Sequence, residues 1–87
     1  MAAYCYVYVL RSTLDNQFYV GLTRDLSARL NLHNSGQVPS TKKRHPLELV
    51  YWEGCLNERD AARREKYLKT AWGKRYIKLR LSAYLTA

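Results

Sequence analysis

The chain has 87 residues, 47% of them hydrophobic, and fifteen Lys and Arg against seven Asp and Glu give it a formal net charge of +8. This length supplies one hydrophobic core, so we expect a single domain over residues 1–87, and the hydrophobic content excludes a disordered chain. The charge predicts a polyanionic partner. A basic protein without such a partner is the alternative, but eight of the cations lie between Arg63 and Arg80, which favours a binding surface.

The two cysteines, Cys5 and Cys55, lie in separate apolar stretches without a neighbouring ligand pattern. They predict neither a disulfide framework nor a cysteine-based zinc site. The longest apolar run, residues 4–10, is too short to cross a bilayer, and the sequence lacks the basic start and cleavage site of a signal peptide. We therefore expect a cytoplasmic protein that does not bind membranes.

The first predicted element is a strand over residues 4–10, a segment rich in aromatic and β-branched side chains. Alternation along a strand gives it two faces. One face holds Tyr4, Tyr6, Tyr8 and Leu10, and the other holds Cys5, Val7 and Val9. Both faces are apolar or aromatic, which predicts a central strand that is covered on both sides.

The later elements follow from turn residues, capping residues and helical periodicity. They are a hairpin partner strand over residues 18–21, a helix from about 24 to 36, a loop over 37–46, a strand over 47–52, and helices over 57–72 and 74–85. We expect Thr23 to cap the first helix, Gly36 to end it, and Gly73 to act as a hinge or cap. The inward residues of the last helix should be Ile77, Leu81, Tyr84 and Leu85. The predicted fold is α+β, a three-stranded, mainly antiparallel sheet flanked by helices in the order ββαβαα.

Glu65 is the most informative residue of the long predicted helix. At 100° per residue it falls in the apolar stripe that Ala61, Leu68 and Trp72 define. Burying a lone carboxylate there costs several kcal/mol unless a cation compensates it. A buried salt bridge to an arginine is one interpretation. The other is a metal ligand, because a hard oxygen donor suits Mg²⁺.

A similar argument applies to the first helix, whose apolar face is set by Leu26 and Leu30. His33 lies on that face and Arg29 borders it, and their i, i+4 spacing makes them neighbours. A satisfied core histidine is the ordinary interpretation, but the planar cation beside it suits a phosphate oxygen. The chain also has eight tyrosines, three of them alternating on the first strand. Because buried phenol hydroxyls need partners, several on one face indicate a polar pocket in an aromatic wall.

The segments Tyr6-Val7-Tyr8 and Tyr19-Val20-Gly21, on two successive predicted strands, resemble the two half-motifs of the GIY-YIG nuclease family. The similarity continues over nearly the whole chain and is closest to the stand-alone, bacterial-type members that consist of this domain only. The further matching residues are 22–26, Arg29-Leu30, His33-Asn34, Gly36, 40–47 and 64–69. Each half-motif is weak evidence alone, but their order and spacing together are specific.

This resemblance implies a metal-dependent endonuclease that hydrolyses nucleic-acid phosphodiester bonds. Tyr8 resembles the tyrosine that activates the attacking water, and Tyr19 should lie beside it in the site. Arg29 matches the arginine that holds the scissile phosphate, and His33 matches the position four residues later. Glu65 matches the sole protein ligand of one divalent ion, Mg²⁺ or Mn²⁺. A free phenol titrates near ~10, so either Tyr8, helped by nearby cations, or His33 is the general base.

Flanking phosphates should bind to the basic loop and to the cationic faces of the last two helices, with a strongly salt-dependent affinity. The residues expected to bind nucleic acid are Lys42, Lys43, Arg44, Lys69, Lys74 and Arg75. With no attached recognition domain in the sequence, we expect a preference for DNA structure over DNA sequence. The sequence itself leaves DNA versus RNA, oligomeric state and pathway open.

Three residues depart from the family pattern. Tyr6 stands where the family name has Gly, Leu22 stands where many relatives carry a Lys or another polar residue, and Leu79 stands where many carry an Asn. Leu22 and Leu79 could impair activity, or a neighbour such as Lys42 could substitute. The alternative function is therefore a catalytically weak or inactive nucleic-acid-binding module of the same fold. A third is an accessory subunit of a larger DNA repair, recombination or mobile-element complex.

Overall fold

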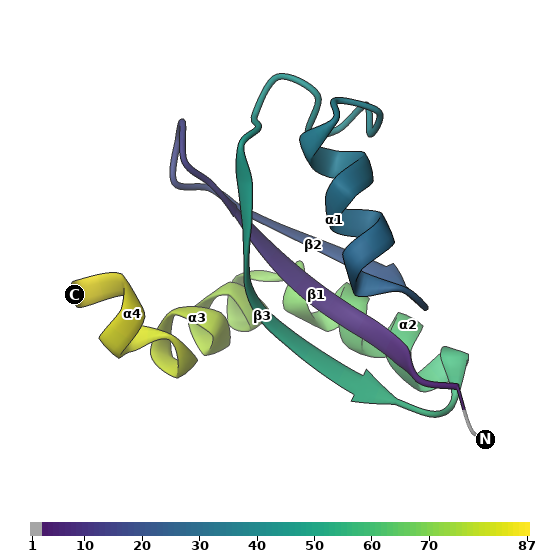
Figure 1. The fold of residues 1–87 in the computed structure, drawn as a ribbon. Helices are drawn as coiled ribbons and strands as arrows, with labels where there is room; N and C mark the ends of the chain where they lie inside the picture. The colour runs from purple at the N-terminus through teal and green to yellow at the C-terminus, as the bar shows by residue number, and fades with distance from the viewer. Residues whose placement is uncertain (1–2) are drawn as a thin grey trace.

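The computed structural model describes residues 3–87, and its element order is ββαβααα (Figure 1). The strands are β1 (Cys5–Ser12), β2 (Phe18–Thr23) and β3 (Leu47–Cys55). The helices are α1 (Leu26–Asn34), α2 (Glu58–Leu68), α3 (Ala71–Arg80) and α4 (Ser82–Thr86). The predicted α+β class is confirmed, with one more helix than expected.

The sheet has the order β2-β1-β3, and both neighbours pair with β1 in antiparallel fashion. The prediction that the first strand is central is therefore confirmed. Tyr8 lies opposite Gly21 on β2 and opposite Trp52 on β3. β3 is longer than predicted because its pairing continues until Cys55 lies opposite Cys5. Both cysteines are free.

The two faces of β1 are covered by different helices, as Figure 1 shows: α1 lies on one side of the sheet, and α2 and α3 lie on the other. The core on the second side consists of Cys5, Val7, Val9, Ala61, Leu68 and Ile77. The core on the α1 side consists of Tyr8, Leu10 and Leu47, with Tyr19, Leu26, Leu30 and Leu49 packed against it. Successive side chains of β1 thus point alternately into one core and the other, as the sequence predicted.

The start of α1 differs from the expectation that Thr23 caps it. Thr23 is the last residue of β2, and Asp25 is the N-cap, with its carboxylate accepting a hydrogen bond from the Ala28 N–H at 3.0 Å. The Thr23 hydroxyl instead accepts the Asp25 N–H at 3.1 Å and shapes the turn into the helix. Gly36 ends the helical segment with φ 76°, the left-handed conformation that was expected of it.

The prediction of one helix over residues 57–72 is wrong, because the helix is interrupted at Thr70, between α2 and α3. The Thr70 hydroxyl donates to the Tyr67 carbonyl at 2.6 Å and accepts the Gly73 N–H at 3.2 Å, which ends α2 and caps α3. Trp72 therefore lies on the next helix, 70% exposed, and not in the stripe with Ala61. Gly73 lies inside α3 and is not a hinge.

The predicted helix over residues 74–85 is likewise two helices, α3 and the short α4. Ile77 is fully buried, and Leu81 and Leu85 are partly buried, as expected of inward residues. Tyr84 is exposed, but its hydroxyl donates to Glu48 on β3 at 3.1 Å. Within residues 3–87, none of the helices has the length and apolar character needed to span a membrane.

The contact of α3 with the end of α2 gives a prediction for Gly73. A Cβ atom at this position would lie 2.2 Å from the Tyr67 carbonyl oxygen and 2.3 Å from the Leu68 Cα, so α3 must move away. We expect Gly73→Ala to lower the free energy of unfolding by about 1–3 kcal/mol, the usual cost of overpacking. Urea denaturation measures it. Gly54→Ala is the control, since its Cβ would meet no atom closer than 3.4 Å, and an equal loss there would contradict the steric explanation.

Candidate active site

The buried Tyr8 side chain extends from β1 across the neighbouring strand β2. Its ring lies directly over Gly21, so closely that a Cβ atom at residue 21 would be 2.2 Å from the phenol oxygen. Only glycine, which has no Cβ, permits this approach. The second half-motif thus provides the space in which the tyrosine of the first half-motif lies.

A chain of hydrogen bonds connects the Tyr8 hydroxyl to α1 and to the following loop. The Arg29 Nε donates to the phenol oxygen at 3.2 Å, and the phenol lies 2.9 Å from the His33 Nε2. The other ring nitrogen of His33, Nδ1, lies 2.7 Å from the hydroxyl of Thr41, which is also buried. Because Arg29 and His33 are one helical turn apart, α1 presents both side chains to the same phenol.

The electrostatics of this chain favour a neutral imidazole. Burial lowers the pKa of His33 below its usual value, and the nearby positive charge of Arg29 lowers it further. A neutral ring has one N–H and one acceptor nitrogen. In the tautomer that carries its proton on Nδ1, the ring donates to the Thr41 hydroxyl, and Nε2 accepts the O–H of Tyr8, whose oxygen already accepts the Arg29 Nε–H. In that tautomer His33 is placed to accept the Tyr8 proton.

These residues border a cavity of about 460 Å³ that wraps around the β2 edge of the sheet. Its polar lining residues are Tyr8, Tyr19, Arg29, His33, Ser40, Thr41, Glu65, Lys69 and Lys74. All five residues expected to be catalytic thus line one cavity, although they come from β1, β2, α1 and α2. Lys69 and Lys74 lie there as well because the break between α2 and α3 turns both helix ends toward it.

The Glu65 side chain is 22% exposed and pairs with the Lys69 ammonium, four residues further on, at 3.4 Å. The buried salt bridge to an arginine that the sequence left open is therefore not found, since the partner is Lys69, whose side chain is 55% exposed. Among residues 3–87 there is no group of three or more His, Cys, Asp or Glu side chains that could hold a metal. Mg²⁺ is often held by one or two carboxylates, with water and substrate phosphate oxygens completing its shell. A single cavity carboxylate fits that ion.

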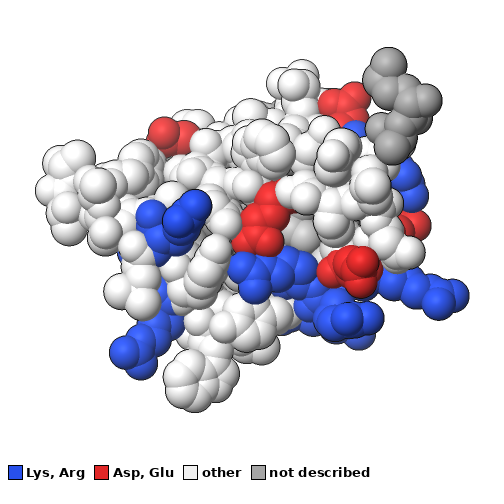
Figure 2. Space-filling view, turned by 90° about the horizontal axis from the view of Figure 1, so that it is seen from below, with Lys and Arg blue, Asp and Glu red and all other residues white. Residues whose placement is uncertain are grey.

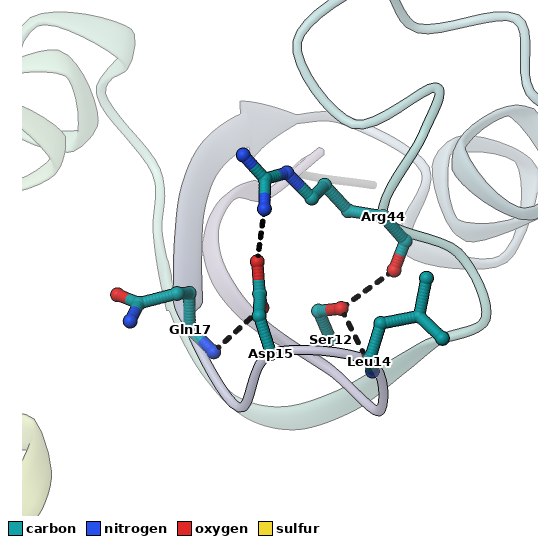
Figure 3. Close-up of polar contacts among 5 residues, drawn as sticks. All are labelled: Ser12, Leu14, Asp15, Gln17 and Arg44. Carbon is teal, nitrogen blue, oxygen red and sulfur yellow. Dashed lines mark hydrogen bonds and ion pairs between the residues drawn. The ribbon is translucent and has the colours of Figure 1, made fainter.

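The basic loop lies outside this cavity. Lys42, Lys43 and Arg44 border a second hollow of about 400 Å³, and Ser40 lines both hollows. Figure 3 shows that Arg44 is held at the β1–β2 turn: its side chain pairs with Asp15, and its carbonyl accepts the Ser12 hydroxyl at 2.6 Å. Of the three cations, Arg44 is thus the one already engaged within the described chain.

Leu22 and Leu79, two of the three residues that depart from the family pattern, do not line the cavity. Leu79 is exposed and does not line the cavity, and Leu22 packs against the core on the α2 side. Lys42 does not line the cavity either, whereas Lys69 and Lys74 do. Arg75 is exposed and lines neither hollow.

Sequence reasoning missed Thr41 as the partner of His33. Its hydroxyl meets the imidazole only because the 37–46 loop folds back over α1, and a threonine within a polar, basic loop carries no distinguishing signal. The close fit of Tyr8 over Gly21 was also missed. The GIY-YIG half-motifs could have indicated it, because they place a tyrosine and a glycine on two strands expected to pair.

Comparison with known proteins adds evidence that is independent of this geometry. A family model described as the GIY-YIG catalytic domain matches residues 4–78. A UPF0213 protein of Clostridium perfringens is 42% identical over 65 residues, covering 74% of this chain and 69% of the relative. One from Staphylococcus haemolyticus is 37% identical over 75 residues, covering 85% and 90%. No solved structure matches the chain.

The burial of His33 gives a prediction about its titration. In a His45→Gln variant His33 is the sole histidine, and NMR should give its imidazole a midpoint below the usual 6.5. As the pH falls, the imidazole of the unfolded chain is protonated before that of the folded chain. The contribution of His33 to the free energy of unfolding is therefore complete above pH 6.5 and is lost as the pH falls through the folded pKa. A midpoint above 6.5 would instead mean a stabilised imidazolium and would contradict the neutral ring.

Proposed function

This chain belongs to the GIY-YIG family, and we propose that it is a metal-dependent endonuclease that hydrolyses phosphodiester bonds, with DNA as its substrate. The observation that carries the proposal is that a phenol, a guanidinium, an imidazole and a carboxylate line one cavity, with the first three in hydrogen-bond contact. Hydrolysis needs an activated water, a positive group for the phosphoryl oxygens, and stabilisation of the leaving oxygen. The cavity offers a group for each task.

Tyr8 and His33 together would activate the water. As water attacks the phosphorus, its proton passes to the Tyr8 oxygen while the proton of Tyr8 passes to the His33 Nε2, 2.9 Å away. Thr41 keeps the acceptor nitrogen of the ring aimed at the phenol. The attack forms the bond from the water oxygen to phosphorus and breaks the bond to the 3′ oxygen, which takes up a proton from solvent water, so the products carry a 5′ phosphate and a 3′ hydroxyl. Tyr8 is then the group that touches water, and His33 holds the proton.

Arg29 would bind a non-bridging oxygen of the phosphate. Its Nε donates a hydrogen bond to the Tyr8 hydroxyl at 3.2 Å, and its two terminal nitrogens make no hydrogen bond within the described residues. A guanidinium has five donors in a planar fork, so it can hold the phenol and a phosphate oxygen at once. Its fixed charge would stabilise the charge that develops on the phosphoryl oxygens, and it would place the phosphorus next to Tyr8.

Glu65 would hold one Mg²⁺ or Mn²⁺, which when bound supplies Lewis-acid charge to the phosphate and the leaving oxygen. In the free protein its carboxylate is paired with Lys69. A phosphate in the cavity offers the Lys69 ammonium a second anion, so this flexible side chain can release the carboxylate. Lys69 and Lys74 would then bind the oxygens of the nucleic acid at the cavity rim.

The surface fits a polyanion. The net charge is +8, and on the face shown in Figure 2 basic side chains extend across the lower half, while acidic ones cover a smaller area and in part adjoin them. Lys42 and Lys43 beside the second hollow, and Arg75 on α3, would bind flanking phosphates with salt-dependent affinity. With these contacts made to the backbone, recognition would follow the structure of DNA more than its sequence.

The metal role predicts the behaviour of Glu65→Gln, which keeps the shape of the side chain and removes its charge. Nicking of supercoiled plasmid in Mg²⁺ should fall by about 100-fold or more, because several kcal/mol of charge stabilisation depend on this ligand. Glu58→Gln on the exposed start of α2 is the matched control and should nick at the normal rate. Undiminished nicking by Glu65→Gln refutes the metal role, and DNA binding without nicking by the unmodified chain would favour the inactive binding module.

The role of Arg29 predicts that Arg29→Ala loses transition-state stabilisation. The expected cost is about 3 kcal/mol in kcat/KM, or ~10²-fold, as is typical for one preorganised electrostatic contact. Single-turnover cleavage of a labelled oligonucleotide measures it. Arg63→Ala, on the exposed side of α2, removes the same charge outside the cavity lining and should change the rate little. Equal effects of the two substitutions would mean that Arg29 contributes only general charge.

A further inference from the structure

An exposed aromatic patch lies on the face of the sheet that carries Tyr8, beyond the part that α1 covers. It consists of Tyr4, Tyr6 and Trp52, and neither the fold nor the proposed hydrolysis accounts for it. Tyr4 is 48% exposed and Trp52 is 51% exposed, whereas Tyr8 on the same face is buried. Half-exposed aromatic side chains gathered in one place are typical of interaction sites.

The three rings form one continuous surface. Tyr6 and Trp52 meet edge to face with centroids 5.4 Å apart, and Tyr4 and Tyr6 lie 6.4 Å apart at 34°. Both tyrosine rings lie beside Gly54, where a Cβ atom would be 3.4 Å from each of them. The two rings thus lie within van der Waals distance of β3. The rings hold one another in place, so a ligand does not have to order them.

The aromatic patch borders the candidate active site. Trp52 lies directly opposite Tyr8 in the β1–β3 pairing, and the Cβ atoms of such partners are about 5 Å apart. The Tyr8 ring leans the other way, over Gly21 on β2. A strand whose phosphate is bound by Arg29 would therefore extend from the cavity past Tyr8 and reach Trp52 and Tyr6.

We propose that the aromatic patch binds an unpaired nucleobase of the substrate strand by stacking, next to the phosphate in the cavity. This inference rests on the proposed function, because it places the strand by its scissile phosphate. Bases stack on exposed aromatic rings whatever their sequence, since each base has a π-face. Inside a duplex those faces are covered by neighbouring bases. The aromatic patch thus selects substrates with a flap, overhang or frayed segment beside the cleavage point.

Charge favours a nucleobase over a second copy of the chain as the occupant. A net charge of +8 opposes self-association through so small an apolar area, whereas a base arrives attached to phosphates. One cation lies beside the patch, because Arg29 donates to Tyr8, the β1–β3 partner of Trp52.

The experiment uses the two tryptophans of the chain, Trp52 and Trp72. In a Trp72→Phe variant, Trp52 is the sole tryptophan, so its fluorescence reports on the patch alone. Titration with a single-stranded oligothymidine in metal-free buffer should quench this fluorescence, while a blunt duplex of equal phosphate number should not. Absence of quenching at concentrations where fluorescence anisotropy shows the oligonucleotide bound overturns the proposal.

Affinity measurements with matched variants complete the test. Trp52→Ala should bind the single strand about 5- to 100-fold more weakly, the range expected for losing one stacked base, and should bind the duplex as before. Trp52→Phe should recover most of the affinity, and Trp72→Ala, a control on α3 that is even more exposed than Trp52, should change neither value. If Trp52→Ala loses affinity equally for the single strand and the duplex, the stacking site is refuted. It is also refuted if light scattering shows a dimer that Trp52→Ala abolishes. Because no metal is present, these results are independent of whether Glu65→Gln affects nicking.

Discussion

The buried hydroxyl of Tyr8, shared between a guanidinium and an imidazole, is the interaction on which the rest of the site depends. A phenol oxygen away from water needs partners, and Arg29 and His33 are the two that it finds. These two hydrogen bonds fix the rotation of α1 about its own axis, because the Arg29 and His33 side chains must both point toward the sheet. It also fixes the following loop, since the second ring nitrogen of His33 takes the Thr41 hydroxyl.

One strand serves both stability and chemistry. The small side chains of β1 pack with Ala61, Leu68 and Ile77 and form the interior, while its tyrosines line a polar cavity and an exposed aromatic surface. The two roles are separated only by the thickness of the sheet. The pairing of β1 on both sides makes this arrangement stiff, so that the phenol, the carboxylate from α2 and the helix α1 keep fixed relative positions.

The sequence predicted what depends on local pattern and missed what depends on particular side-chain contacts. Alternation in β1 and the half-motifs were enough for the central strand, the antiparallel sheet and the α+β class. The long apolar stripe that joined Ala61 to Trp72 was misleading, because the Thr70 hydroxyl ends one helix and begins another within that stripe. Glu65 faces the cavity even so, since it lies one turn before the break. The Thr41 contact depends on a loop conformation, and no periodicity encodes that.

The absence of a side chain at residue 21 limits which amino-acid substitutions the site can accept during evolution. Any Cβ at this place would take the position of the Tyr8 ring, so the tyrosine and the glycine form one steric unit divided between two strands. Neither can be exchanged singly without emptying the centre of the cavity or filling it. A descendant that altered the chemistry here would have to replace both together, whereas the surrounding cations could be exchanged one at a time.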